Sequence, residues 1–313
     1  MGDEGLRFLL AQVRPFSWVE GPGDLPLPMA AIPLMASFDG WFTDPDEPDA
    51  FQAMLRRRVE GLKVDLLSEP DPEEVIARWR RVRELRFSTR PEPVSTSALI
   101  LGMAPESLAP ALSERAGAAY RAASAVLRPT RFRYSLYLGL RKEVVPVGMG
   151  DHAIFCARDD EPVEGVNCLL ISLSAEDQSG VAPEGCRAMT VSADLPLAEA
   201  ADPGALDARA REMLTRVKEL VPFLERYLEV LHIPRPGPVG QDNPLPVDAT
   251  PAVFAGDPGA ARLPTFGGMG VHLPHRNAFY AGRASMPALG IEGEVLSGMV
   301  VDRLVKAVLP RKR

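Results

Sequence analysis

The segment GRASMPALGIEGEVLSG, residues 282–298, carries the residue types best suited to hold a negatively charged ligand. Its glycines are Gly282, Gly290, Gly293 and Gly298, after the short apolar run NAFYA and before a helical pattern. Backbone N–H groups at glycines and at a helix N-terminus can approach an anion closely, because no side chain intervenes and the helix end carries partial positive charge. Glycine-rich strand–helix junctions also serve tight packing, so both a ligand site and a packing role remain open on this pattern alone.

The other reactive residue types show no spacing typical of a metal or nucleophile site. His152, His232, His272 and His275 have no cysteine or carboxylate at metal-ligand spacing, and HLPH places only two imidazoles near each other. The chain contains no G-x-S-x-G motif. We therefore expect no metal site. His272 and His275 directly precede the glycine-rich segment and are candidates for contact with its ligand.

Composition and charge limit the class of protein and its partners. The chain has 313 residues, of which 46% are apolar and 25% charged, as in an ordinary globular protein of one or two domains. The net charge of −7 and the interspersed charges argue against nucleic acid as the main partner. No signal peptide, membrane-length apolar run or paired cysteine spacing is present, which predicts a cytoplasmic setting. A short amphipathic helix near the N-terminus leaves peripheral membrane contact open.

Apolar periodicity predicts the elements that position the glycine-rich segment. Helices are expected over 45–60, 114–127, 207–231 (with a bend at Pro222) and 291–309. Strands are expected over 62–67 and 97–103, and a mainly antiparallel sheet over 131–196, with strands at 131–140, 152–157, 167–174 and 186–195.

Residues 71–87 allow two structures. Asp71 as N-cap and Pro72 at the first helical position favour a helix with Val75, Ile76 and Trp79 on one face. The same letters fit a two-stranded meander, EEVIARW then VRELRF, although Trp79-Arg80-Arg81 is a poor hairpin turn.

The join of NAFYAG with GIEGEVLSG resembles the C-terminal cofactor segment of FAD-dependent phytoene desaturase and amine oxidase-like flavoproteins. STSALILGMAPESLAPAL is similar to the strand by which such chains return to the FAD domain. The resemblance implies an α/β (α+β) fold, with a partial FAD-binding Rossmann-like domain and a substrate domain built on a mainly antiparallel sheet and helices. It also favours the meander over the helix at residues 71–87.

The resemblance further implies FAD as the cofactor and a two-electron oxidation of an apolar substrate, such as desaturation. The residues that it implies for cofactor binding are Gly282, Arg283, Ala284, Gly290, Ile291, Glu292, Gly293 and Ser297. No catalytic residue follows from it. Arg283 stands where the family has an acid, and this leaves two alternatives: direct contact with phosphate, or a site that no longer binds FAD in the usual way.

One part of the family pattern is absent, the strand–GxGxxG–helix unit that opens the FAD site. GGMG at 267–270 fits a loop instead. We therefore expect a helical segment of the substrate domain over 1–60, a partial FAD-binding domain over 61–112, the substrate domain over 113–262 and the C-terminal FAD segment over 263–313. A second chain that supplies the missing unit, or a homo-oligomer, is the expected partner. The alternatives are a non-catalytic binding or assembly protein with this fold, or a truncated fragment.

Overall fold

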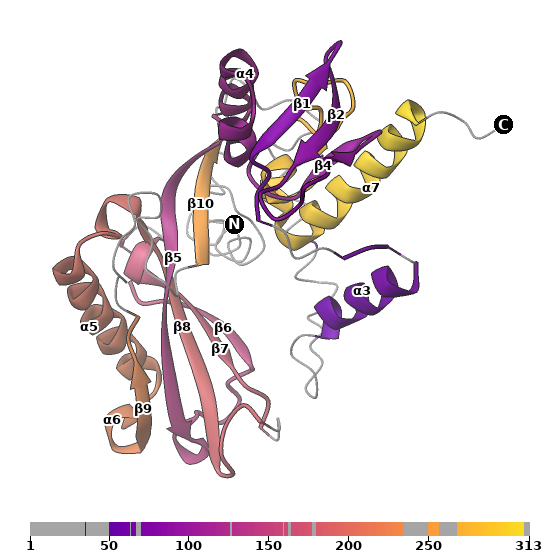
Figure 1. Cartoon of the computed structure of the whole chain (residues 1–313). Coiled ribbons are helices and arrows are strands. Elements are labelled where there is room, and N and C mark those ends of the chain that lie inside the picture. The colour runs from indigo at the N-terminus through magenta and orange to yellow at the C-terminus, as the bar shows by residue number, and fades with distance from the viewer. Residues whose placement is uncertain are drawn as a thin grey trace. The chain divides into compact units, whose positions relative to one another are not determined.

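The computed structural model describes residues 35, 50–62, 64–66, 70–125, 127–158, 160–161, 164–176, 180–234, 250–256 and 268–309. The chain divides into two compact units (Figure 1). Unit 1 contains Leu34–Arg56 and Pro129–Val253, and unit 2 contains Arg57–Arg128 and Phe254–Arg313. Helices and sheets are mixed, and the largest sheet is antiparallel, which confirms the expected α/β (α+β) class.

The sheet of unit 1 has six strands in the order β10-β5-β8-β7-β6, with β9 also paired to β5. The strands are β5 (Leu127–Arg141), β6 (His152–Cys156), β7 (Cys168–Leu173), β8 (Cys186–Pro196), β9 (Leu228–His232) and β10 (Thr250–Gly256). The pairs β5–β8, β8–β7, β7–β6 and β5–β9 are all antiparallel. The four strands expected between 131 and 196 are thereby confirmed.

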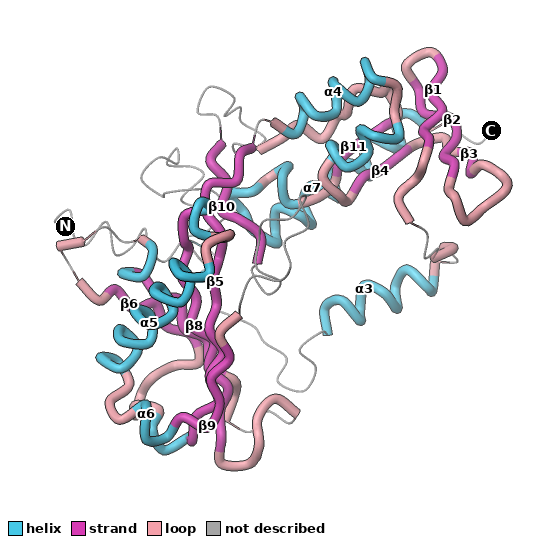
Figure 2. Tube along the Cα trace, turned by 60° about the vertical axis from the view of Figure 1, so that its left-hand side comes forward, coloured by secondary structure: helices cyan, strands magenta, loops and turns pink. Residues whose placement is uncertain are grey.

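One face of this sheet forms the core of unit 1. Alternate residues of β5, namely Phe132, Tyr134, Leu136, Leu138 and Leu140, are buried, as period-two alternation predicts. Helix α5 (Pro203–Leu220) lies beside the sheet (Figure 2), and its buried residues Leu206, Ala210, Met213 and Val217 belong to the same core. The side chain of Asp202 caps this helix by accepting hydrogen bonds from Gly204 N and Ala205 N at 2.9 and 3.2 Å.

The prediction of a single long helix over 207–231 is wrong for the residues after Leu220. Helix α5 ends at Leu220, a short helix α6 (Leu224–Tyr227) follows, and Leu228–His232 forms strand β9. Pro222 removes a backbone donor, and Phe223 adopts a left-handed conformation with φ of 67°. Pairing with β5 then overrides the helical pattern of the last residues.

Unit 2 contains two small sheets and two longer helices. Its strands are β1 (Glu74–Arg78), β2 (Arg81–Arg86), β3 (Val94–Ser95), β4 (Leu99–Leu101) and β11 (Ala278–Tyr280). Its helices are α4 (Glu114–Ser124) and α7 (Gly290–Val308), and α3 (Ala50–Gly61) spans the boundary with unit 1. Its short 3-10 turns are η2 (Pro105–Ala111), η6 (Arg283–Ser285) and η7 (Pro287–Leu289), whereas η3 (Lys142–Val144), η4 (Gly165–Asn167) and η5 (Leu197–Glu199) belong to unit 1. All the expected helices and strands of this unit form except the strand at 62–67.

Residues Val64–Leu66 form no strand, which contradicts that expectation. Val64 and Leu66 are both more than half exposed. Alternation alone does not hold a strand without a paired edge, and none of the described strands pairs with these residues.

The meander prediction for residues 71–87 is confirmed. β1 and β2 pair antiparallel, with a bulge between Ile76 and Ala77, and β3 pairs with β2. The turn residues Trp79 and Arg80 both have positive φ, at 55° and 59°. Tryptophan and arginine rarely adopt this conformation, so the sequence of the turn is unfavourable by itself. Contacts from elsewhere in the chain therefore have to hold this turn.

Candidate functional site

The candidate site lies where two parallel strands end together. β11 pairs with β4, with Ala278 opposite Leu99 and Tyr280 opposite Leu101 (Figure 2). Ala281 N continues the ladder by donating to Leu101 O at 2.9 Å. Gly102 and Gly282 consequently follow the carboxyl ends of the two strands, and open α/β sheets bind ligands at that end.

The chain then turns twice before entering α7. η6 and η7 connect Gly282 to Gly290, where the helix begins. Leu289, at the N-cap position, provides no side-chain hydrogen bond to the first turn of the helix. Gly290 N donates to Pro287 O, while the next N–H groups of the turn have no partner within the helix and lie at the positive end of 19 helical residues.

Three of the predicted glycines are required by the chain's own packing. Gly290 has φ of 59° and ψ of −133°, a conformation that other residues rarely adopt. A Cβ at Gly293 would collide with the carbonyl oxygen of Met286, and one at Gly282 would lie 2.7 Å from the hydroxyl of Tyr280. These contacts favour the packing role that the sequence left open.

Gly102 is different, because the space beside it is open. The nearest atom to a Cβ added there is Ala281 O, at 3.9 Å. The glycine pattern of residues 282–298 does not point to this residue. The sequence does contain a feature that marks Gly102, because this glycine directly follows the apolar run of the strand that pairs with β11.

The side chains around the turn divide into buried and outward-facing groups. Arg283 Nε lies 3.7 Å from Glu294 Oε1 on α7, and both side chains are more than one-third exposed. Ser297 is fully buried and donates to Glu294 O at 2.6 Å, while Ile291 and Glu292 face outward. Ala284 N donates to the Tyr280 hydroxyl at 3.2 Å, and burial is the main cause of the raised pKa of Tyr280.

Ser285 is a second residue that the sequence analysis did not assign. It is 1% exposed, and its hydroxyl makes no hydrogen bond to any described residue. A buried hydroxyl without a partner is costly unless something else bonds it. Ser285 therefore supplies the kind of group that a ligand at this turn would satisfy.

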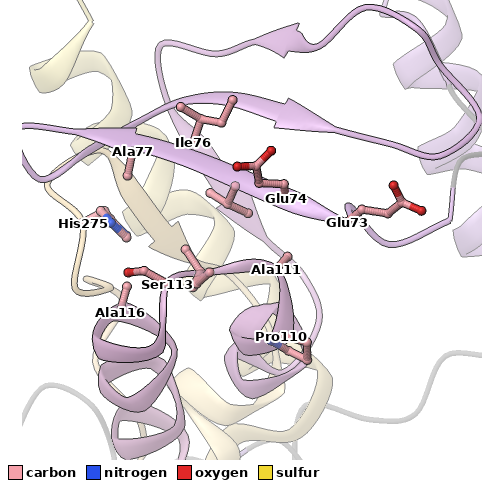
Figure 3. Close-up of a pocket in the computed structure, with 11 residues that line it drawn as sticks. Glu73, Glu74, Ile76, Ala77, Pro110, Ala111, Ser113, Ala116 and His275 are labelled. Atoms are coloured by element: carbon pink, nitrogen blue, oxygen red, sulfur yellow. The ribbon is translucent and has the colours of Figure 1, made fainter.

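A separate cavity of about 480 Å³ lies in unit 2 beside β1 (Figure 3). Its lining comes from residues 73–77, 110–113, Ala116 and His275. His275 is buried, and its Nδ1 lies 3.0 Å from the hydroxyl of Tyr120. Burial, with a smaller contribution from the charge of Arg80, lowers the pKa of His275. None of the residues predicted to bind the cofactor lines this cavity.

His272 packs beside β11. Its ring lies 5.5 Å from that of Phe279, and the two residues form an isolated bridge beside β11. Within the described ranges, no three histidines, cysteines or carboxylates are grouped as metal ligands would be. No helix in those ranges has the length and apolar character needed to cross a membrane.

Comparison with known proteins supports the fold. No protein-family model and no curated protein sequence matches the chain. An oxidoreductase from Methanosarcina mazei matches with a TM-score of 0.51 at 14% identity, over 74% of this chain and 48% of its own. Cyclohexylamine oxidase from Brevibacterium oxydans matches with a TM-score of 0.50 at 13% identity, over 81% of this chain and 51% of its own. A flavin-dependent brominase matches with a TM-score of 0.42 at 11% identity, over 85% of this chain and 58% of its own.

The chain thus has a fold that is also found in oxidoreductases, an amine oxidase among them. It spans about half the length of those two proteins.

Proposed function

We propose that this chain forms the substrate domain and one side of the cofactor site of an FAD-dependent oxidoreductase. The observation that carries the proposal is the arrangement at the end of the parallel pair: β4 and β11 end together at Gly102 and Gly282, and α7, which has no side-chain cap, follows after two short turns. The oxidoreductases that share the fold support the class of reaction. FAD itself rests on the resemblance of residues 282–298 to the flavoprotein segment.

The residues at the junction fit a diphosphate or the electron-rich edge of a flavin. Gly102 leaves its backbone accessible, the first turn of α7 offers N–H groups, and Ser285 offers a buried hydroxyl. Arg283 adds positive charge next to the turn, shared with Glu294. A bound flavin would supply the two-electron acceptor, and the protein would position the substrate and exclude water. An apolar substrate, and desaturation in preference to amine oxidation, rest on the family resemblance alone.

A non-catalytic binding or assembly protein is the second candidate. It is favoured by the glycine contacts, since Gly282, Gly290 and Gly293 are each required by the chain's own backbone and packing. A chain that had lost the cofactor would still need these glycines to keep its fold.

Titration with FAD, followed by the visible absorbance of the flavin, tests the proposal. The titration uses the purified chain alone and the chain co-expressed with the product of the adjacent upstream gene. We expect FAD to bind, and Gly102→Ala to weaken binding by about tenfold or more, because its Cβ enters the open approach while lying 3.9 Å from Ala281 O. Val147→Asp, at a fully exposed position of unit 1, is the control. A folded protein that takes up no FAD in either preparation would rule out the flavin site and leave the binding protein.

A further inference from the structure

The β4–β11 sheet has an open edge. Leu99 N donates to Asn277 O at 2.8 Å, and Leu101 O accepts from Ala281 N. Because successive residues of a strand direct their N–H and C=O groups to opposite edges, the backbone of Ile100 faces away from β11. No described strand pairs with β4 on that side. Parallel sheets of two short strands are rarely stable alone, and such an edge readily accepts another strand.

Helix α7 has a second uncovered feature, an apolar outer face. Its buried stripe consists of Gly290, Gly293, Ser297 and Val301, which face the rest of unit 2. Away from this stripe, Ile291, Val295 and Met299 recur every fourth residue and are 57%, 48% and 57% exposed. Leu296 and Val300 are also exposed. The outer face of a surface helix is normally polar, so this one is typical of an interface.

Gly298 provides independent evidence for a close partner. It lies in the middle of α7, where glycine costs about 1 kcal/mol relative to alanine. A Cβ at this position would meet no atom of the described residues within 4 Å, so packing against them does not require the glycine. Close approach of another backbone to the helix would require it.

We propose that the open edge of β4 and the outer face of α7 bind a second polypeptide, which adds a parallel strand beside β4 and packs an apolar helix face on α7. The inference rests on the proposed function, because the added strand would complete the sheet at the cofactor site. A strand of a parallel sheet is usually followed in its own chain by a crossover helix, so we expect the partner to supply both a strand and a helix. The oxidoreductases with this fold are about twice as long as the part that this chain matches, which leaves room for such a unit.

A second copy of the chain fits this surface less well. Two-fold symmetry would place two β4 strands antiparallel, across only three residues each. Each copy also carries a net charge of −7, which opposes self-association.

Site-specific photo-cross-linking in the native cells tests the proposal. A photoreactive amino acid replaces Val295, Met299 or, as the control, Val147, and mass spectrometry identifies the cross-linked protein. We expect positions 295 and 299 to trap one and the same protein, with a strand–glycine-rich turn–helix sequence, and position 147 not to trap it. Cross-links to a second copy only, or to no protein, would overturn the proposal.

Binding of the purified partner then measures the interface. Val295→Asp and Met299→Asp should each weaken binding by about tenfold or more, since an aspartate is costly in an apolar interface, and Val147→Asp should leave it unchanged. Thermal unfolding of the free variants checks that they fold, as expected for half-exposed positions. Unchanged affinity in both α7 variants would also overturn the proposal.

The flavin spectrum separates this inference from the proposed function. A stable complex that takes up no FAD would refute the function and leave the interface. A monomeric chain that binds FAD tightly would support the function and refute the interface.

Discussion

The side-chain amide of Asn277 pairs with both backbone groups of Val82, 195 positions earlier in the chain, in the way that the backbone of a neighbouring strand would. Val82 N donates to Asn277 Oδ1, and Asn277 Nδ2 donates to Val82 O, each at 2.8 Å. The same Nδ2 donates to Ser97 O at 2.9 Å, and the residue is 1% exposed. Because Asn277 directly precedes β11, this amide ties the meander to the strand that leads into the candidate site.

Asn277→Ala should lower the free energy of unfolding by about 2–4 kcal/mol, because it leaves the N–H and C=O groups of the buried residue Val82 without partners. Urea unfolding measures the change. Thr215→Ala is the control, since it removes an exposed side-chain hydrogen bond to Arg211 O and should cost less than about 0.5 kcal/mol. Equal costs for the two variants would show that the Asn277 amide does not hold the meander.

This amide also explains what the sequence predicts well and what it does not. The strands of unit 1 follow from alternation such as that of residues 131–140, because one buried face is enough to specify them. The Trp79-Arg80 turn depends on Asn277 and on Arg276 N, which donates to Arg80 O at 2.9 Å. No local pattern reveals such remote contacts. The meander was therefore predicted from the family resemblance, against the local helix signal.

The candidate site shows the same limit. The glycine pattern predicts a tight strand–helix junction at 282–293, and the structure has one. It does not predict Gly102 or Ser285, because their relevance depends on which strand pairs with β11 and on burial. The cavity beside His275 combines three separate stretches of the chain, so only the folded structure reveals it.

Two glycines of α7 should respond in opposite directions to alanine. Gly293→Ala places a Cβ against the carbonyl oxygen of Met286, so it should destabilise the protein by about 1–3 kcal/mol. Gly298→Ala meets no atom and should stabilise the free chain by up to about 1 kcal/mol, through its higher helix propensity. Thermal unfolding of both variants under one condition compares them directly. A destabilising Gly298→Ala would mean that the chain itself requires this glycine.

The stability of the protein should depend on pH through His275. Burial lowers the pKa of this imidazole below its ordinary value of 6.5, so the unfolded chain binds a proton more readily than the folded one. The contribution of His275 is therefore complete above pH 6.5 and is lost as pH falls through the lowered pKa.

His275→Gln removes this titration and keeps polar atoms near the Tyr120 hydroxyl. Urea unfolding of both proteins as a function of pH, with the two curves subtracted, isolates the histidine from the carboxylates that titrate in both. The difference should grow as pH falls below 6.5 and be constant above it. A difference that is constant throughout would contradict burial of a neutral imidazole.

Substitutions of Arg283 and Glu294 distinguish two roles of this arginine, a contact with the ligand and a structural ion pair with Glu294. Their atoms are 3.7 Å apart and both side chains are partly exposed, so the pair should contribute less than about 1 kcal/mol to stability. If Arg283 contacts a phosphate of FAD, Arg283→Ala should weaken FAD binding by about tenfold, since a charge-assisted contact is lost. Glu294→Gln should strengthen it, because the change removes a nearby negative charge and releases the guanidinium from this carboxylate. Titration at low and at high salt, on whichever preparation binds FAD, measures both effects. Equal and small changes in affinity for the two variants would assign this arginine to packing against α7.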